Sequence, residues 1–231
     1  MSRSRWVLFD LDGTLFDYEA AETAAVGATL LDAGVAVTDE AVAAYREINR
    51  RHWVALERGT TTPERLRTER WQEFLSERGL PGVDAADLAR AYLRHLAAGS
   101  HLLDGAAEVV ATVAATHRIA YITNGLPEVQ RARLEASPLT AHGEVLVISE
   151  EVGVAKPHPA IFDVAFERMG SPDRSDVTLV GDSLTADIAG GLAYGLTTVW
   201  LAPAAVASPG AAGPSPTHRI AHLRDLPPLL A

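Results

Sequence analysis

The stretch Val7-Leu8-Phe9-Asp10-Leu11-Asp12-Gly13-Thr14-Leu15 joins a short apolar run to two aspartates and a glycine turn. An apolar run of this length that ends in turn residues predicts a buried strand. Because side chains alternate along a strand, Asp10 and Asp12 face the same side if the extended conformation persists. Two carboxylates this close are tolerated when a divalent cation bridges them or when one keeps its proton. The stretch therefore predicts a strand that carries an acidic pair at its carboxyl end.

Further apolar runs along the chain predict a parallel sheet. With Trp6–Asp10, the predicted strands are Arg118–Thr123, Glu144–Ile148, Val177–Gly181 and Thr197–Leu201. Helical patterns alternate with the later strands, at Gly105–Thr116, Pro127–Ala136, Pro159–Met169 and Thr185–Tyr194. This alternation predicts an α/β fold, a doubly wound parallel sheet with helices on both faces. In such sheets, ligands bind beyond the carboxyl ends of the strands.

The long gap between the first two strands indicates an insertion, since an ordinary crossover is much shorter. Helical patterns fill the gap, at Glu19–Ala33, Asp39–Glu57, Pro63–Arg78 and Asp84–Ala98. We therefore expect a catalytic core from residues 1–15 and 101–231, and a four-helix cap domain from residues 16–100. The cap is expected to stand over the strand ends. Near the end of the chain, Pro203–Pro216 is predicted to be a surface loop, and Ile220–Leu230 a last short strand or helix.

Three further groups of polar residues follow predicted strands. Thr123-Asn124-Gly125 offers a hydroxyl and backbone amides, although such residues are also ordinary turn formers. Lys156 precedes a proline and follows an apolar approach, which suggests a fixed ammonium rather than a solvated one. Asp182 follows Gly181 at the end of a strand, and Asp187 lies where a helix dipole also favours an acid. The parallel architecture is expected to bring all of these residues together.

Composition excludes several classes of protein. A formal charge of -10 argues against contact with a nucleic-acid polymer, which needs a clustered basic surface. The chain has no cysteine, so disulfides, thiolate metal sites and cysteine nucleophiles are excluded. No apolar run approaches the ~18 residues of a membrane span, so no membrane partner is expected. Without a recognisable secretory signal, the predicted location is the cytoplasm.

These motifs resemble the four motifs of the haloacid dehalogenase superfamily, and the resemblance covers essentially the whole chain. It implies a Rossmann-like core and a Mg²⁺-dependent phosphatase. Asp10 would be the nucleophile that forms an aspartyl-phosphate, and Asp12 the acid and then the base. Thr123, Asn124, Gly125 and Lys156 would bind the phosphoryl group, and Thr123 and Lys156 would also act in catalysis. The metal would be held by Asp10, the backbone carbonyl of Asp12, and Asp182, while Asp187 would act through water or by orienting other ligands.

A narrower resemblance concerns the substrate. Leu146–Pro157, Pro172–Ser175 and Tyr45–Trp53 are similar to segments of noncanonical pyrimidine 5'-nucleotidases. The predicted substrate is therefore a small phosphate ester, a pyrimidine nucleoside 5'-monophosphate. Acylneuraminate-9-phosphate, phosphoglycolate and sugar phosphates remain alternatives. Tyr45 and Trp53 can stack on a base, but packing between helices is the expected role of each.

Other reactions and roles are less compatible with the sequence. A 2-haloacid dehalogenase of this superfamily lacks an acid at the position of Asp12. A receiver-like module controlled by phosphorylation has its phosphorylated aspartate on the third strand, where Ile148-Ser149 stands here. A phosphomutase shares the same intermediate, and a catalytically silent scaffold would not need all of these polar residues. We expect a monomer or a homodimer.

Overall fold

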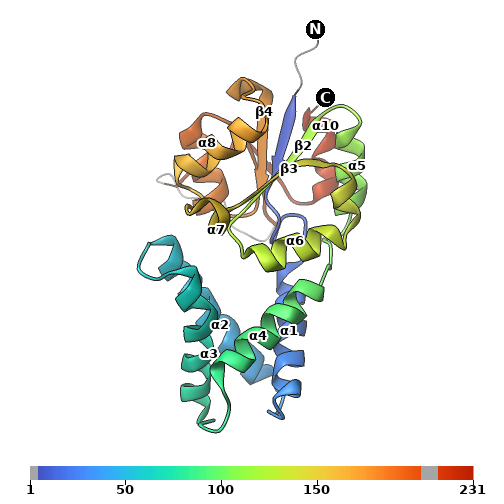
Figure 1. Ribbon diagram of the computed structural model, residues 1–231. Helices are drawn as coiled ribbons and strands as arrows, with labels where there is room; N and C mark the ends of the chain where they lie inside the picture. Colours follow the sequence, from blue (N-terminus) through green and yellow to red (C-terminus); the bar gives the residue numbers. More distant parts are fainter. Residues whose placement is uncertain (1–4, 204–212, 231) are drawn as a thin grey trace. The chain divides into compact units, whose positions relative to one another are not determined.

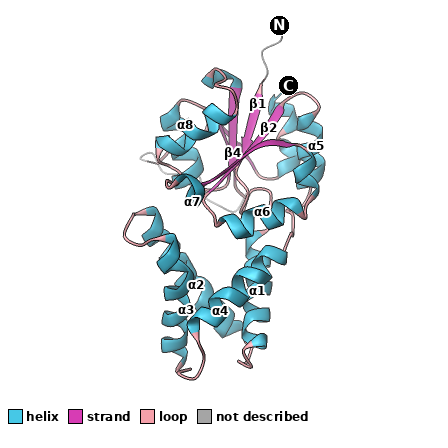
Figure 2. Ribbon diagram, viewed as in Figure 1, coloured by secondary structure: helices cyan, strands magenta, loops and turns pink. Residues whose placement is uncertain are grey.

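The computed structural model describes residues 5–203 and 213–230. Its central sheet has six parallel strands in the order β3-β2-β1-β4-β5-β6. Figures 1 and 2 show strands of this sheet with α8 on one side and α5 on the other. The strands are β1 (Trp6–Phe9), β2 (Arg118–Thr123), β3 (Gly143–Ile148), β4 (Val177–Gly181), β5 (Thr197–Leu201) and β6 (His218–Ile220). The predicted α/β class and parallel sheet are confirmed, and the five predicted strands correspond to β1–β5.

Alternating residues of β1 build the core on both faces of the sheet. Val7 and Phe9 belong to an apolar cluster with α5, whereas Trp6 and Leu8 belong to a second cluster with α8. All four side chains are almost fully buried. This two-sided burial explains why the strand is apolar throughout rather than alternating with polar residues. The core helices are α5 (Ala106–Ala114), α7 (Ser149–Val152), α8 (Pro159–Arg168), α9 (Ala189–Tyr194) and α10 (Pro227–Leu230).

The strand order reverses direction at β1. The chain passes from β1 outward through β2 to β3, then returns to the other side of β1 as β4 and continues outward to β5 and β6. A reversal of this kind leaves a crevice beyond the carboxyl ends of the two strands that flank it. The topology therefore directs attention to the residues that follow β1 and β4.

Two predicted segments differ in detail from the structure. Thr185–Tyr194, predicted as one helix, forms a π-helical turn over Leu184–Ile188 and then α9. The segment Ile220–Leu230 contains both predicted alternatives in part, because β6 ends at Ile220 and α10 lies near the end of the chain. Most of the predicted surface loop Pro203–Pro216 lies outside the described residues.

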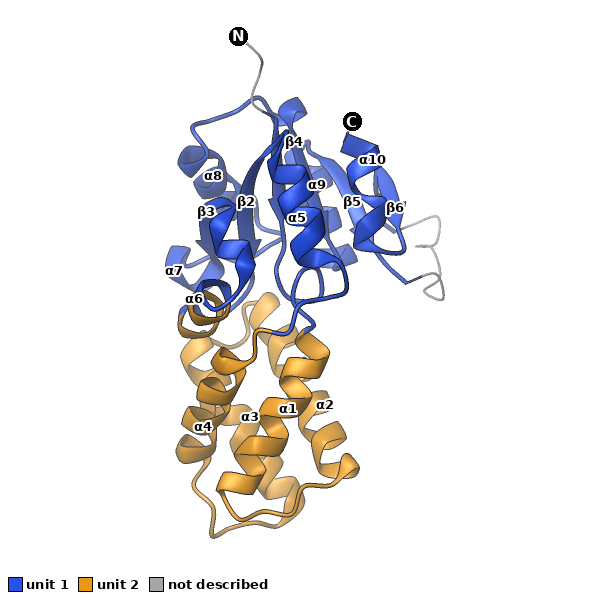
Figure 3. Ribbon diagram, turned by 90° about the vertical axis from the view of Figure 1, so that its right-hand side faces the viewer, with its two compact units in different colours: residues 1–17, 101–127, 134–231 blue, residues 18–100, 128–133 orange. Residues whose placement is uncertain are grey.

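The chain divides into two compact units (Figure 3). Unit 1 comprises Met1–Asp17, His101–Pro127 and Leu134–Ala231, and unit 2 comprises Tyr18–Ser100 and Glu128–Arg133. The helix α6 (Pro127–Glu135) contributes residues to both units. The predicted domain boundaries stay a prediction, and the compact units differ from them at residues 16–17 and 128–133.

Unit 2 contains helices α1 (Tyr18–Asp32), α2 (Asp39–Glu57), α3 (Pro63–Arg78) and α4 (Ala85–Ala98). Side-chain caps begin three of them, because Thr38, Thr62 and Asp84 each accept a hydrogen bond from a backbone N–H of the first turn. These caps fix the helix starts close to the predicted positions. Within the described part of the chain, no helix is both long and apolar enough to cross a bilayer. The cytoplasmic location stays a prediction.

Aromatic side chains fill the interior of unit 2. The rings of Tyr45 and Trp71 lie 4.1 Å apart, and those of Tyr45 and Tyr92 lie 5.2 Å apart. All three residues are fully buried. The expected packing role of Tyr45 is therefore confirmed, whereas Trp53 is only half-buried.

A buried polar network crosses the same interior and links three helices. The Asn49 amide donates to Oε1 of Glu22 at 2.6 Å, and its oxygen accepts from Nη1 of Arg70 at 2.7 Å. All three residues are at most 4% exposed. Burial raises the pKa of Glu22, although hydrogen bonds from Asn49 and Arg46 oppose the shift. Asn49 is thus the bridge between a buried carboxyl group and a buried guanidinium.

We predict that Asn49→Ala lowers the free energy of unfolding by about 3 kcal/mol, because it leaves two buried charged groups without their shared partner. Urea unfolding followed by circular dichroism measures the change. The control is Arg50→Ala on the same helix, which removes only an exposed ion pair with Glu47 and should change the stability far less. Equal losses in the two variants would contradict the role assigned to the network.

Candidate active site

The residue after β1 is held in line with the neighbouring strand. The backbone N–H of Asp10 donates to the carbonyl of Val180 on β4 at 2.9 Å, which continues the pairing of the two strands. Asp10 is only 5% exposed. Its carboxyl group therefore occupies a fixed position in the crevice that the strand order predicts.

A tight turn follows Asp10 and brings the chain close to Asp182. The N–H groups of Leu15 and Phe16 both donate to the carbonyl of Leu11 at 2.8 Å. Gly13 has φ +85°, and a Cβ there would lie 2.5 Å from Oδ2 of Asp182. Only glycine satisfies both constraints, which explains its place in the motif.

The same turn contains Asp12 and Thr14. Asp12 is half-buried, and its backbone forms a bridge with Phe16. The Thr14 hydroxyl, which is fully buried, donates to Oδ1 of Asp182 at 3.3 Å. The turn after β1 thus contacts the acidic residue that follows β4.

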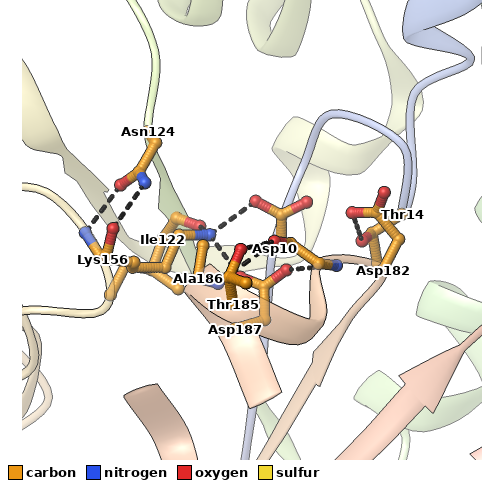
Figure 4. Close-up of polar contacts among 10 residues, drawn as sticks. Asp10, Thr14, Ile122, Asn124, Lys156, Asp182, Thr185, Ala186 and Asp187 are labelled. Atoms are coloured by element: carbon orange, nitrogen blue, oxygen red, sulfur yellow. Dashed lines mark hydrogen bonds and ion pairs between the residues drawn. The ribbon is translucent and has the colours of Figure 1, made fainter. Parts of the chain in front are cut away.

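Lys156 lies at the centre of the site (Figure 4). Its Nζ donates to Oδ1 of Asp10 at 2.6 Å, to Oδ1 of Asp187 at 2.7 Å and to the carbonyl of Ile122 at 3.0 Å. These contacts use all three of its N–H donors, and the residue is 2% exposed. Burial by itself lowers the pKa of Lys156, but the charges of Asp10 and Asp187 raise it above its usual value. Lys156 is therefore a permanent, immobile positive charge.

Asp187 uses both of its carboxylate oxygens to hold neighbouring groups. Oδ1 accepts from Lys156, and Oδ2 accepts from the backbone N–H of Ser183 at 3.0 Å. A Cβ at Gly181 would lie 2.3 Å from Cγ of Asp187, so glycine at this position is required for the approach. Asp187 thus fixes both the lysine and the turn that contains Asp182.

The arrangement of carboxylates fits a divalent metal ion. One oxygen from each of Asp10, Asp182 and Asp187 lies within 4.8 Å of the others. Oδ2 of Asp10 is buried and has no hydrogen-bond partner among the residues that the structure describes. Lys156 offsets only one of the three charges, so ionised carboxylates would leave two uncompensated. Hard divalent cations such as Mg²⁺ prefer such oxygen ligands.

Without a bound cation, the site disfavours the ionised forms of Asp10 and Asp182. Burial raises the pKa of Asp10 well above its usual value, and the charges of Asp187 and Asp182 act in the same direction, against Lys156. Desolvation of its carboxyl group, followed by the charge of Asp187, raises the pKa of Asp182 to about 7, although the residue as a whole remains exposed. A bound cation would reverse both shifts.

Asn124 contacts the backbone of Lys156 through both ends of its amide (Figure 4). Its Oδ1 accepts from the Lys156 N–H at 2.8 Å, and its Nδ2 donates to the Lys156 carbonyl at 2.9 Å. Asn124 was predicted to bind substrate, yet its side chain is committed to the lysine, so any contact with substrate would come from its main-chain N–H. Thr123 and Gly125 are buried on either side of it.

The structure thus brings together Asp10, Lys156, Asp182 and Asp187 directly, and Asn124 through the lysine backbone. Asp12, Thr123 and Gly125 lie at the same ends of β1 and β2, and their predicted roles stay predictions. The sequence reasoning did not assign a role to Thr14 or to the Ile122 carbonyl. Thr14 directly follows Gly13, and Ile122 directly precedes Thr123. Because Gly13 and Thr123 belong to the recognised motifs, this proximity in the sequence could have pointed to both residues.

Comparison with known proteins gives consistent matches. Residues 5–195 match the family described as haloacid dehalogenase-like hydrolase. The chain is 37% identical over 228 residues to the pyrimidine 5'-nucleotidase YjjG of Escherichia coli, and this match covers 97% of each chain. It is 30% identical to the pyrimidine 5'-nucleotidase PynA of Streptococcus pneumoniae over 86% of this chain and 84% of that one.

A solved structure shares the fold over nearly the full length. The HAD-hydrolase YfnB of Bacillus subtilis, crystallised with bound magnesium, has a TM-score of 0.90 and 33% sequence identity. The match covers 99% of both chains.

We predict that Asn124→Ala lowers kcat on the generic ester p-nitrophenyl phosphate by about 100-fold, because a displacement of roughly 1 Å in a catalytic group has an effect of this size. Steady-state kinetics measure the loss, and a melting curve verifies that the variant folds. Asn124→Asp keeps an acceptor for the Lys156 N–H and loses the second bond, so its kcat should be intermediate. A wild-type kcat in the alanine variant would show that the side-chain contacts of Lys156 hold it in place without the two hydrogen bonds from Asn124.

Proposed function

The chain belongs to the haloacid dehalogenase-like hydrolase family, and we propose that it is a Mg²⁺-dependent 5'-nucleotidase that acts on pyrimidine nucleoside monophosphates. Family membership together with the similarity to nucleotidases supports a hydrolase of phosphoric monoesters. One observation supports the chemistry most directly: Asp10 is buried beside a fixed ammonium and two further carboxylates, with one oxygen unpartnered. The substrate class is supported by similarity to two pyrimidine 5'-nucleotidases.

In the first half of the proposed reaction, the Asp10 carboxylate attacks phosphorus, and the bond from phosphorus to the ester oxygen breaks. Asp12 gives its proton to the departing oxygen, so that the nucleoside leaves as a neutral alcohol. The products of this half are the alcohol and an aspartyl-phosphate on Asp10. In the second half, Asp12 removes a proton from water, which attacks the same phosphorus and releases phosphate from Asp10.

The other residues would bind and orient the phosphoryl group. Lys156 and a bound Mg²⁺ together would keep Asp10 ionised. The fixed positive charge of Lys156 would also stabilise charge on the phosphoryl oxygens, although its three N–H donors are already used by the protein. The Thr123 hydroxyl and the Gly125 N–H would donate hydrogen bonds to those oxygens. Mg²⁺, held by Asp10, Asp182 and the carbonyl of Asp12, would supply further charge stabilisation for the transferring group.

The test is a panel of phosphate esters assayed for release of inorganic phosphate. We expect UMP and dTMP to give the highest kcat/KM, above acylneuraminate-9-phosphate, phosphoglycolate and glucose 6-phosphate. The matched control, Asp10→Asn, should lose about 10⁴-fold or more in kcat, because it removes the nucleophile.

The other outcomes separate the alternatives. If UMP and dTMP are inert while another ester turns over, the nucleotidase assignment is wrong and the phosphatase assignment stands. A phosphomutase would convert a sugar phosphate without steady phosphate release. A dehalogenase would release chloride from 2-chloropropionate.

Binding of Mg²⁺ should weaken as the pH falls. Because the pKa of Asp182 in the metal-free protein is about 7, its carboxyl must lose a proton to bind the ion below that pH. The proton then competes with the metal, and affinity at pH 6 should be at least about tenfold lower than at pH 8, because the pKa of the other carboxylate ligand, Asp10, is raised as well. Isothermal titration at the two pH values measures the ratio.

Two controls accompany this measurement. Asp182→Asn should bind Mg²⁺ weakly at both pH values, with a smaller ratio between them. Protein treated with chelator should release no phosphate from an ester substrate such as UMP until Mg²⁺ is added back. Equal affinities at pH 6 and pH 8 in the wild-type protein would argue against Asp182 as a ligand.

A further inference from the structure

A tryptophan on the neighbouring strand contacts the main chain of Asp182. Trp200 pairs with Gly181 in the register of β5 and β4. Its indole Nε1 donates a hydrogen bond to the carbonyl of Asp182 at 2.8 Å. The contact is made to the peptide group, so it acts on the position of the residue rather than on its charge.

The indole itself is held firmly. Trp200 is 3% exposed and packs with Ile188 and Ala202, with Leu192 at the edge of the same apolar cluster. On β6, the guanidinium of Arg219 lies over the ring, 4.8 Å from its centroid. An indole has two rotatable side-chain bonds, and packing of this kind leaves it one orientation. Trp200 can therefore transmit the rigidity of the sheet to the group that it contacts.

Asp182 needs such support because the regular sheet ends just before it. β4 ends at Gly181, and Asp182, taken as a whole residue, is exposed. The hydrogen bond that its carboxylate receives from Thr14 is long, at 3.3 Å. The orientation of the carboxylate therefore depends mainly on where the peptide of Asp182 lies, and Trp200 anchors that peptide from outside the turn.

We propose that Trp200 is a positioning residue that holds Asp182 in the geometry needed to bind Mg²⁺. This inference rests on the proposed function, in which Asp182 is a metal ligand. Mg²⁺ demands nearly ideal octahedral geometry, so a small shift of one ligand weakens binding. Loss of a group that orients a ligand typically weakens metal binding by 10–100-fold. Trp200 thereby extends the metal site to a residue that never touches the ion.

The experiment removes the indole N–H and leaves its shape unchanged. Replacing Trp200 with 3-benzothienylalanine keeps the fused ring and exchanges N–H for sulfur, while Trp200→Phe removes the same donor with a smaller ring. Mg²⁺ is titrated into the full-length, metal-free protein by calorimetry, without substrate. We expect the Kd for Mg²⁺ to rise about 10–100-fold in both variants. In assays, the Mg²⁺ concentration for half-maximal rate should rise by the same factor, with kcat at saturating Mg²⁺ retained.

The packing control is Leu192→Ala, which disturbs the same apolar cluster without removing the hydrogen bond. It should lower the melting temperature and leave the Kd for Mg²⁺ within about twofold of the wild-type value, because Leu192 lies at the edge of the cluster and the hydrogen bond from Trp200 to the Asp182 carbonyl stays in place. A wild-type Kd in the benzothienylalanine protein overturns the inference, as does an equal loss of affinity in Leu192→Ala. If the wild-type protein itself binds no Mg²⁺, the proposed function fails as well, so the two failures are distinguishable.

Discussion

The ammonium of Lys156, buried between two carboxylates, is the interaction on which the rest of the site depends. Burial of an unpaired lysine or aspartate is strongly unfavourable, so neither Asp10 nor Lys156 would be stable at its depth alone. Together with Asp187 they form a buried group in which the positive charge of Lys156 and the negative charges of the two carboxylates stabilise one another. One ammonium does not balance three carboxylates, and this excess of negative charge is what makes the site suited to a cation.

The fold supplies this charge arrangement through backbone geometry. The reversal of strand order at β1 brings the ends of β1 and β4 together, and two glycines allow the closest approaches. Gly13 makes room for Asp182, and Gly181 makes room for Asp187. A methyl group at either position would push apart the carboxylates of the proposed metal site. Backbone topology and two absent side chains thus determine the electrostatics of the site.

The sequence predicted those parts of the site that depend on local pattern and on sheet topology. The convergence of Asp10, Lys156 and Asp182 follows from strands that end in polar residues at one edge of a parallel sheet. The pair of hydrogen bonds between Asn124 and the Lys156 backbone was missed because it joins two loops whose residues lie 32 positions apart in the chain. The Asn49 network was missed because polar residues on amphipathic helices are usually exposed. The hydrogen bond of Trp200 was missed because an aromatic residue on a strand indicates only core packing.

The engagement of Asn124 also bears on which reaction the site favours. An amide that binds the lysine backbone with both ends is not available to a substrate. In the proposed reaction, the core residues form a phosphoryl site: a fixed ammonium, a buried aspartate as nucleophile and an acid at position 12 that would protonate an alkoxide. A halide leaves without a proton and needs no such acid. The chemical class is therefore set by the core, and the choice among phosphate esters must be made by other residues of the chain.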